Sequence, residues 1–482
     1  MLRIKTIFNL DLQKFLIKVF CQLNFIFVTS KLSDNRLIFA IAGPAVLQTL
    51  VKSLFTIIDS YWVGHLGSAQ LASITVANFL VWGAMALGEL IPTGTNSLVA
   101  QSKGARETEM GRQISTVNLI DTLFLTVLIS IIAIPSLPFL YDIIGIDTQK
   151  RIFTDDYLIT FLLGMPCVTL LSTAAAIFRG NGDTKTPFYL ITLAVGLNFF
   201  LAPLLIFGLG PVPALEMKGA ALSTLISYAI AFIAGYIILR KRNLVNKISD
   251  YNFAAKIKKH TFKIGLPVSM SGLAFSLIYV FVSRFVAEYG TTGLAALGIG
   301  HRSEAISYQI YIGLSLAATI LVGQNIGSGN KDRAEKLAWK IFKFGISAAV
   351  IYSIFLFIFS APIAAFFSTD PDVISAASDF NKITAIILIF SAAEVILSGA
   401  FSGAGETVPP VVIGLTSNIL RIPMCAIASG IWGLNGIWYA ICLSVAIKGI
   451  LITYWFYRGK WKEREFELKT KKENIIGLVE DE

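Results

Sequence analysis

Charge is scarce in this sequence, and so are cysteine and histidine. Charged residues make up 15% of the 482 residues, whereas a typical soluble domain is about a quarter charged, so a soluble chain is disfavoured. The four cysteines (Cys21, Cys167, Cys425 and Cys442) show no paired or metal-ligand spacing, so we expect packing residues and no disulfide framework. The three histidines form no HExxH pair, and no acidic metal motif is present, which leaves a membrane enzyme as the most distant alternative.

Apolar residues take the place of the missing charge and come in long blocks. They make up 55% of the chain, in blocks of about 20 residues or more, the length of a helix that crosses a bilayer. We predict twelve spans at 37–63, 71–99, 114–138, 156–178, 186–208, 218–240, 262–286, 294–322, 337–360, 380–402, 409–430 and 433–457. Backbone groups must be satisfied within lipid, and no ten-residue alternation indicates a barrel, so the predicted fold is an all-α integral membrane bundle.

The basic residues behind the net charge of +10 are concentrated on one side of the predicted membrane topology, so this charge does not indicate nucleic-acid binding. The loops and termini of one side carry 29 Lys and Arg residues, and the opposite side carries four: Lys150, Arg151, Lys218 and Lys382. By the positive-inside rule both termini lie in the cytoplasm, against the anionic lipid of a plasma (inner) membrane. We therefore expect membrane lipid as a partner, and an interfacial amphipathic helix at 1–33.

The chain repeats itself at an offset of 223 residues. FRGNGDTKTPF at 178–188 returns as FSGAGETVPPV at 401–411, with Asp183 replaced by Glu406. Further pairs in the same register are Pro44 and Pro267, Gly67 and Gly290, Gln101 and Gln324, and Gly104 and Gly327. Loop glycines and prolines in constant register over more than 140 positions are not expected by chance, so we infer an internal duplication.

Each copy holds six spans, and an even number returns the chain to the same side of the membrane. The copies are therefore parallel repeats, two lobes related by a pseudo-two-fold axis along the membrane normal. The predicted parts are an N-terminal segment at 1–33, an N-lobe at 34–240, a basic connector at 241–260, a C-lobe at 261–457 and a charged cytoplasmic tail at 458–482. Two parallel lobes indicate a transporter, whereas a channel would show a selectivity loop or a symmetric pore.

The doubled turn itself is predicted to be structural. Its glycines permit a tight reversal, and Asp183 or Thr186 would cap the next helix. Glu406 and Thr407 are expected to do the same in the second copy. No strand precedes the turn, and the Lys-Ser/Thr pattern of a P-loop is missing, so nucleotide binding is not expected.

Charged groups inside the predicted spans are functional candidates, because each costs about 2.5–3.5 kcal/mol at a helix centre. Asp59 stands out late in the first span, with Lys52 seven residues earlier on the same stripe and about 10 Å away. A carboxylate in such a cavity can exchange a proton or Na⁺, while capping of the helix end is the structural alternative. Asp121 and Lys448 are expected to pair within their own lobes.

Several motifs resemble the multidrug and toxic compound extrusion (MATE) family, in its prokaryotic DinF-like type. They are DSYWVGHLG, GNGDTKTP, NFFLAPLLIFGLG, KGAALSTLIS and GIGHRSEAIS…GLSLAATILVGQNIGSGN, in order along residues 34–457. The resemblance implies a secondary active efflux transporter that exports organic compounds, with cations favoured. It also implies exchange for H⁺ or Na⁺ by rocking of two lobes, without a bound cofactor.

The resemblance places the coupling-ion site in the N-lobe, on Asp59, Asn198 and Thr224, with Asp59 and Asn198 as ligands should the ion be Na⁺. One departure concerns the Asn-x-x-x-Asp-Pro pattern that the family often has in the fifth span. Here NFFLAP puts Ala202 where the Asp would stand. With one acid missing, a proton relay through Asp59 is easier than a Na⁺ site, because Na⁺ requires several oxygen ligands.

Candidates for the substrate cavity come from both lobes. Arg421 occupies the repeat position of Asn198, which makes the lobes chemically unequal and leaves an anionic or zwitterionic substrate open. Glu304 is expected to neutralise Arg302. The cavity candidates are Lys52, Glu89, Trp62, Arg284, Tyr308, Glu394 and Arg421. For the aromatic ones, core packing or interface anchoring is the structural alternative.

We expect a small-molecule substrate, no nucleic acid and a monomer. The alternative within the same superfamily is a flippase for a lipid-linked sugar or another amphipathic substrate. Such relatives usually carry extra spans and a more cationic cavity.

Overall fold

The computed structural model describes residues 33–144, 148–208, 213–246 and 251–468, and every regular element in these ranges is a helix. The helices are α2 (Asp34–Gly64), α3 (Ser68–Gly88), α4 (Leu90–Gly104), α5 (Thr108–Ile144), α6 (Thr148–Gly180), α7 (Lys185–Phe207), α8 (Glu216–Lys241), α9 (Tyr251–Ala287), α10 (Gly290–Gly327), α11 (Lys331–Ile358), α12 (Ser360–Phe367), α13 (Pro371–Ala385), α14 (Leu388–Gly403), α15 (Val408–Tyr457) and the 3₁₀ helix η2 (Lys460–Glu463). Residues 40–482 form one compact unit. Residues 1–39 form another, of which residues 33–39 are described, so the predicted interfacial helix lies outside the described residues apart from Ser33.

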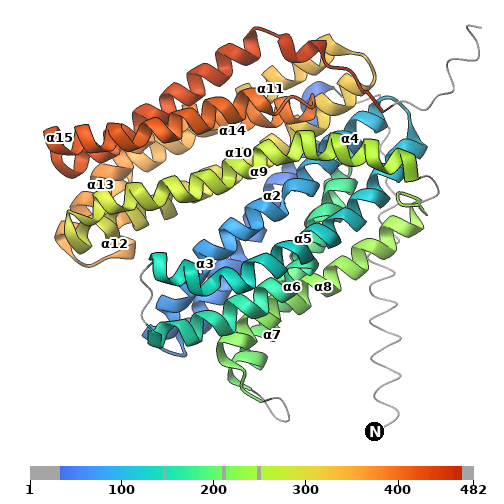
Figure 1. Ribbon diagram of the computed structural model, residues 1–482. Coiled ribbons are helices and arrows are strands. Elements are labelled where there is room, and N and C mark those ends of the chain that lie inside the picture. The colour runs from blue at the N-terminus through green and yellow to red at the C-terminus, as the bar shows by residue number, and fades with distance from the viewer. Residues whose placement is uncertain (1–32, 145–147, 209–212, 247–250, 469–482) are drawn as a thin grey trace, which may run out of the picture. The chain divides into compact units, whose positions relative to one another are not determined.

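The membrane spans can be counted from these helices. Nine helices in the described ranges are long and apolar enough to cross a membrane, and α13 with α14 makes a tenth span, bent by 56°. α15 holds two predicted spans, because its backbone turns at Trp432 and Gly433. α3 and α4 form the predicted second span, interrupted at Glu89. All twelve predicted spans are thus helical (Figure 1).

Two of the interruptions have a cause in the local sequence. Pro92 in α4 cannot donate the helical hydrogen bond to the carbonyl of Gly88, so the helix is weakened where α3 ends. Gly433 has φ 60° and ψ −142°, a conformation that is open to glycine and strained for other residues.

Each half of the chain buries an apolar core of its own. The N-lobe core collects side chains from α2, α3 and α5 to α8. The C-lobe core collects them from α9, α10, α12, α13 and α15, with Phe380 edge-on against Trp438 at 4.9 Å. In Figure 1 the helices coloured blue to green gather on one side, and those coloured yellow to red gather on the other. Two separate cores are what a duplicated six-helix unit requires, so the predicted two-lobe, all-α fold is confirmed.

The first copy of the doubled turn behaves as predicted. Gly182 has φ 89°, in the left-handed region that favours glycine. Asp183 caps α7, because its Oδ1 accepts the backbone N–H of Thr186 at 2.9 Å. The other carboxylate oxygen binds Arg242 Nη1 at 2.6 Å, which ties the turn to the end of α8.

The second copy keeps the turn and changes the cap. Gly405 stands at the repeat position of Gly182 and has φ 79°. Glu406 is ion-paired with Arg464, just as Asp183 is ion-paired in the first copy. Thr407 does not cap α15, and its hydroxyl instead donates to the carbonyl of Ile264 at 2.9 Å. The expectation of a Thr407 cap is wrong, because its hydroxyl is bonded to α9 and accepts no backbone N–H of α15.

The chain beyond α15 packs against the protein. Trp461 stacks on Phe456 with ring centroids 4.6 Å apart. Phe466 and Leu468 are buried in an apolar cluster with Ile257 of α9. The predicted charged tail is therefore docked at least as far as Leu468.

Candidate functional site

Asp59, Asn198 and Thr224 meet inside the N-lobe. They lie on α2, α7 and α8, and each is at most 6% exposed. Thr224 Oγ1 donates to Asp59 Oδ2 at 3.2 Å, and Asn198 Nδ2 donates to Thr224 Oγ1 at 3.0 Å. Asn198 Nδ2 also lies 3.5 Å from Asp59 Oδ1. The fold thus brings together the three residues expected at the coupling site.

The donors to this carboxylate are neutral, and one amide oxygen is unused. The hydrogen bonds that the described residues make to Asp59 come from Asn198 and Thr224, and neither side chain is charged. Asn198 Oδ1 is buried and has no hydrogen-bond partner among the described residues. Ala202, one turn further along α7, is fully buried, where a second carboxylate would stand. A buried carboxylate with no cation beside it is costly, so this geometry suits the uptake and release of a proton or cation.

Aromatic side chains cover this site on both sides along α2. Phe55, one turn before Asp59, stacks on Tyr228 of α8 at 4.7 Å. Trp62, about one turn after Asp59, packs against Phe199 of α7 at 6.3 Å. Trp62 is therefore part of the N-lobe packing, which agrees with the alternative of core packing given for the aromatic candidates.

Lys52 and Glu89 form an ion pair of their own. Lys52 Nζ lies 3.9 Å from Glu89 Oε1, and Ser172 Oγ donates to the same oxygen at 3.0 Å. The two charged side chains are 45% and 38% exposed, so they remain open to a ligand. Lys52 thus contacts Glu89, at the break between α3 and α4, rather than Asp59.

Arg421 is a buried cation in the C-lobe, only 1% exposed. Its Nε donates to Ser444 Oγ at 2.8 Å, and its guanidinium group lies over the ring of Tyr279 at 5.6 Å. The repeat position that holds a neutral amide in the N-lobe, Asn198, therefore holds a positive charge in the C-lobe.

Lys448 pairs with Glu394, and this pairing within one lobe confirms the prediction for Lys448. Its Nζ lies 2.9 Å from both carboxylate oxygens. The matching prediction for Asp121 is wrong, because Asp121 Oδ1 binds Lys258 Nζ at 2.8 Å. Lys258 belongs to the predicted connector, whose second half forms the start of α9 and packs against α5.

Glu304 does not neutralise Arg302, contrary to expectation. Arg302 lies over the ring of Phe367 at 5.7 Å. The titratable neighbour of Glu304 is instead His301, whose Nδ1 lies 3.8 Å from Glu304 Oε2. The reason is helical geometry, since residues three apart share a face and residues two apart do not.

Tyr308 and Arg284 are the remaining cavity candidates. Tyr308 is 50% exposed in the middle of α10, and Arg284 is exposed in the last turn of α9. Their placement on open surface is compatible with a cavity wall, and their role stays a prediction.

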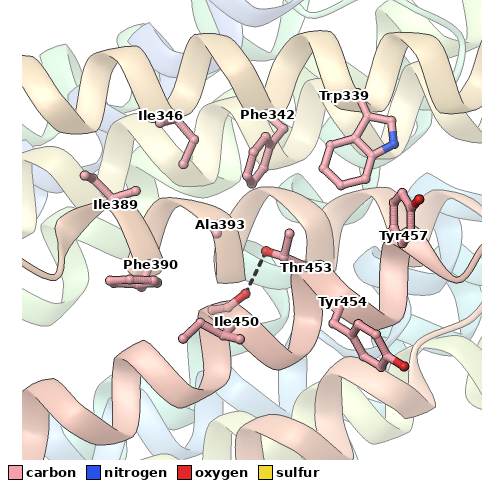
Figure 2. Close-up of a pocket in the computed structure, with 11 residues that line it drawn as sticks. Trp339, Phe342, Ile346, Ile389, Phe390, Ala393, Ile450, Thr453, Tyr454 and Tyr457 are labelled. Carbon is pink, nitrogen blue, oxygen red and sulfur yellow. Dashed lines mark hydrogen bonds between the residues drawn. The ribbon is translucent and has the colours of Figure 1, made fainter.

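A cavity of about 560 Å³ lies among α11, α14 and α15 (Figure 2). Its walls are apolar and include Trp339, Phe342, Phe390, Tyr454 and Tyr457. None of the candidate residues lines it, so it is distinct from the predicted substrate site.

Two serines of these sites were missed in the sequence. Ser223 Oγ lies 3.3 Å from Asn198 Nδ2, and its signal was its place beside Thr224 in KGAALSTLIS. Ser444 contacts Arg421 from 23 residues away, and no motif marks it.

Twelve helical spans in two lobes, with buried charges in each lobe, define a membrane transporter. The MatE family profile matches the chain twice, at residues 44–204 and 267–427. The two matches start 223 residues apart, at the offset of the internal repeat. The chain therefore belongs to the MatE family, and it is a transporter and not an enzyme.

Curated relatives and solved structures agree with this assignment. The chain is 25% identical to a probable multidrug resistance protein NorM of Thermotoga maritima, over 88% of this chain and 92% of the relative. It is 26% identical to an FAD transporter of Shewanella oneidensis, over 87% and 94%. A MOP superfamily transporter from Pyrococcus furiosus, described as having a binding pocket of reverse polarity, superposes with a TM-score of 0.83 at 22% identity, over 90% of this chain and 98% of that one. An outward-facing MATE family multidrug resistance transporter gives 0.81 at 24% identity, over 90% and 97%.

Proposed function

We propose that the protein exports organic compounds, with cations favoured, in exchange for protons that bind Asp59. The observation that carries this proposal is the buried contact of Asp59 with Asn198 and Thr224 across three helices. Relatives named as multidrug resistance proteins, such as NorM of Thermotoga maritima, support the substrate class.

The contact suggests how protonation changes the conformation. The carboxylate of Asp59 accepts hydrogen bonds from α7 and α8, and charge-assisted bonds of this kind are the stronger ones. A proton on Asp59 weakens both bonds at once and loosens α2 from α7 and α8. A helix that moves with the charge of one carboxylate supports the rocking of two lobes.

Protons are favoured over Na⁺ by the donors around Asp59. The amide nitrogen of Asn198 faces the carboxylate, so its oxygen is turned elsewhere. Ala202 supplies no second carboxylate. A Na⁺ ion would need several oxygens at this point, whereas a proton needs one.

We place the protein in the plasma (inner) membrane as a monomer, with both termini in the cytoplasm. The support for this orientation is the distribution of 29 Lys and Arg residues on one side against four on the other.

The test is transport by proteoliposomes under separate H⁺ and Na⁺ gradients. We expect an H⁺ gradient to drive uptake of an organic cation by the wild type and Asp59→Asn to lower this rate at least tenfold. Asp156→Asn is the matched control, because Asp156 is paired with Lys218 at 3.2 Å and both side chains are partly exposed. Transport driven by Na⁺ alone at constant pH, or full activity of Asp59→Asn, would contradict the proposal.

An anionic substrate is a second candidate, favoured by the buried Arg421. A relative named as an FAD transporter shares 26% identity with the chain. The same vesicles can be tested for uptake of FAD. Uptake by the wild type that is lost in Arg421→Gln would favour an anionic substrate over an organic cation.

A further inference from the structure

Gln101 reaches from the N-lobe to the end of a C-lobe helix. It lies in the last turn of α4, is buried, and its Nε2 donates to the carbonyl of Gly403 at 2.8 Å. Ser97, one turn earlier, donates to the carbonyl of Ser402 at 2.6 Å. Both acceptors belong to the last turn of α14, where carbonyls lack the regular partner four residues on that a continuing helix supplies.

Gln324 makes the same contact in the opposite direction. It lies in the last turn of α10, and its Nε2 donates to the carbonyl of Gly180 at 3.0 Å. Gly180 ends α6 in the N-lobe. The offset of 223 residues relates Gln101 to Gln324 and Gly180 to Gly403, so the repeat exchanges donor and acceptor between the lobes.

The backbones of α4 and α10 approach closely at the same place. A Cβ atom on Gly104 would lie 1.9 Å from the carbonyl oxygen of Gln324, and one on Gly327 would lie 2.0 Å from that of Gln101. These two glycines are also repeat partners. The contact therefore leaves no room for a Cβ atom at either glycine.

We propose that Gln101 and Gln324 form a reciprocal clasp that closes the basic side of the protein between the lobes. Both hydrogen bonds break each time the substrate cavity opens to that side. The inference rests on the proposed alternation between two lobe arrangements and adds the residues that set its balance. The turns that carry the two acceptor carbonyls are the doubled motifs at 178–188 and 401–411, so these motifs act as receptors for the glutamines.

The chemistry of the clasp suits a contact that must open repeatedly. A neutral amide that donates to a carbonyl is a modest bond, worth about a fivefold change in an equilibrium constant. Together with the Ser97 bond, two such bonds favour the closed arrangement without trapping it, whereas a buried salt bridge would leave two bare charges on opening. An uncharged clasp is also insensitive to salt, although it lies among basic loops.

The test measures the separation of the lobes on the basic side. Spin labels are placed at the exposed residues Thr108 and Asp332, in the first turns of α5 and α11, on a cysteine-free background. Double electron–electron resonance in nanodiscs then gives the population of the long distance for Gln101→Leu, Gln324→Leu and the double variant. Asn325→Leu is the matched control, because the amide of Asn325 donates to Leu321 of its own helix at 2.7 Å.

We expect each single variant to raise the long-distance population about fivefold and the double variant to raise it about 25-fold, with Asn325→Leu unchanged. Gly104→Ala is expected to open the basic side further, which shows that the labels report opening. An unchanged distance distribution in the double variant would overturn the clasp. Opening in the glutamine variants supports the clasp independently of the transport assay. H⁺-driven transport and its loss in Asp59→Asn test the coupling site alone, so failure of that assay would not contradict the clasp.

Discussion

Buried charges in the two lobes are stabilised in different ways. Lys448 and Glu394 neutralise each other at 2.9 Å, and Arg421 rests on a hydroxyl and an aromatic ring. Asp59 is held by neutral donors. An opposite charge nearby stabilises the ionised form of a group and so opposes a change of protonation. Neutral donors stabilise the ionised form of Asp59 less, so Asp59 is the better coupling group.

The Lys448–Glu394 pair gives a stability prediction at this scale. Lys448→Met leaves the Glu394 carboxylate without its cation, and loss of one partner of a buried pair costs about 3–5 kcal/mol. We expect a clear fall in the unfolding temperature of the detergent-solubilised protein.

Lys218→Met is the control for this variant, because its pair with Asp156 is exposed and worth at most about 1 kcal/mol. The double variant Lys448→Met with Glu394→Gln should recover part of the loss. Equal unfolding temperatures for Lys448→Met and Lys218→Met would show that the buried pair is not stabilising.

For single residues, the sequence predicts the role of a side chain better than it predicts which side chains it contacts. Asp59, Asn198 and Thr224 were placed together by a family resemblance, and the fold joins them. Lys52 shares a stripe with Asp59 and still contacts Glu89, because a long side chain pairs with a neighbouring helix. Partners across helices depend on packing that no spacing within one helix contains.

At the scale of elements, helix interruptions also show that features set by tertiary contacts cannot be predicted from the local sequence. The break at Glu89 has a signal, since Pro92 removes the hydrogen bond to Gly88. The break between α13 and α14 falls at Ile386 and Ile387, in an apolar run with neither glycine nor proline. The first could be predicted from the sequence and the second could not, because only tertiary contacts distinguish it from a continuous span.

The reversal inside α15 can be tested with one glycine. Gly433→Ala places a Cβ at φ 60° and ψ −142°, a conformation that costs a residue other than glycine about 1–3 kcal/mol. We expect a lower unfolding temperature. Gly430→Ala, three residues earlier with no atom within 4 Å of its added Cβ, is the control and should be neutral. A neutral Gly433→Ala would mean that the turn adopts another conformation.

At the scale of the whole molecule, the segment after α15 binds the N-terminal third of α9. His260 Nε2 and Glu467 Oε2 lie 2.8 Å apart, and Lys263 lies 3.7 Å from the other carboxylate oxygen. The hydrogen bond with His260, helped by the charge of Lys263, holds the pKa of Glu467 below its usual value. A lowered pKa stabilises docking above the usual pKa of a glutamate, and that stabilisation is lost as the pH falls.

We therefore expect the segment to undock below a pH of about 4. A spin label on the exposed Glu465 should become mobile as the pH is lowered from neutrality. In a Glu467→Gln background the label should be more mobile at neutral pH and respond less to acid. A pH response of equal size in both backgrounds would assign the change to another group.

The duplication explains why the large architecture could be predicted. The lobes, the turns and their orientation all follow from residues in constant register, such as Gly182 and Gly405, which share one left-handed conformation. The docking of Phe466 and Leu468 could not be predicted in this way, because the segment lies beyond the second copy and has no repeat partner with known surroundings.

The alanine at position 202 has an electrical consequence. With Asp59 as the carboxylate of the N-lobe site, one elementary charge enters per transport cycle under the proposed exchange. Export of a monovalent cation against one proton is then electroneutral, and the membrane voltage adds nothing to it. Export of an uncharged compound instead gains about 2.3 kcal/mol per 100 mV. The charge of each substrate would thus decide whether a cell exports it on its pH gradient alone or also on its membrane potential.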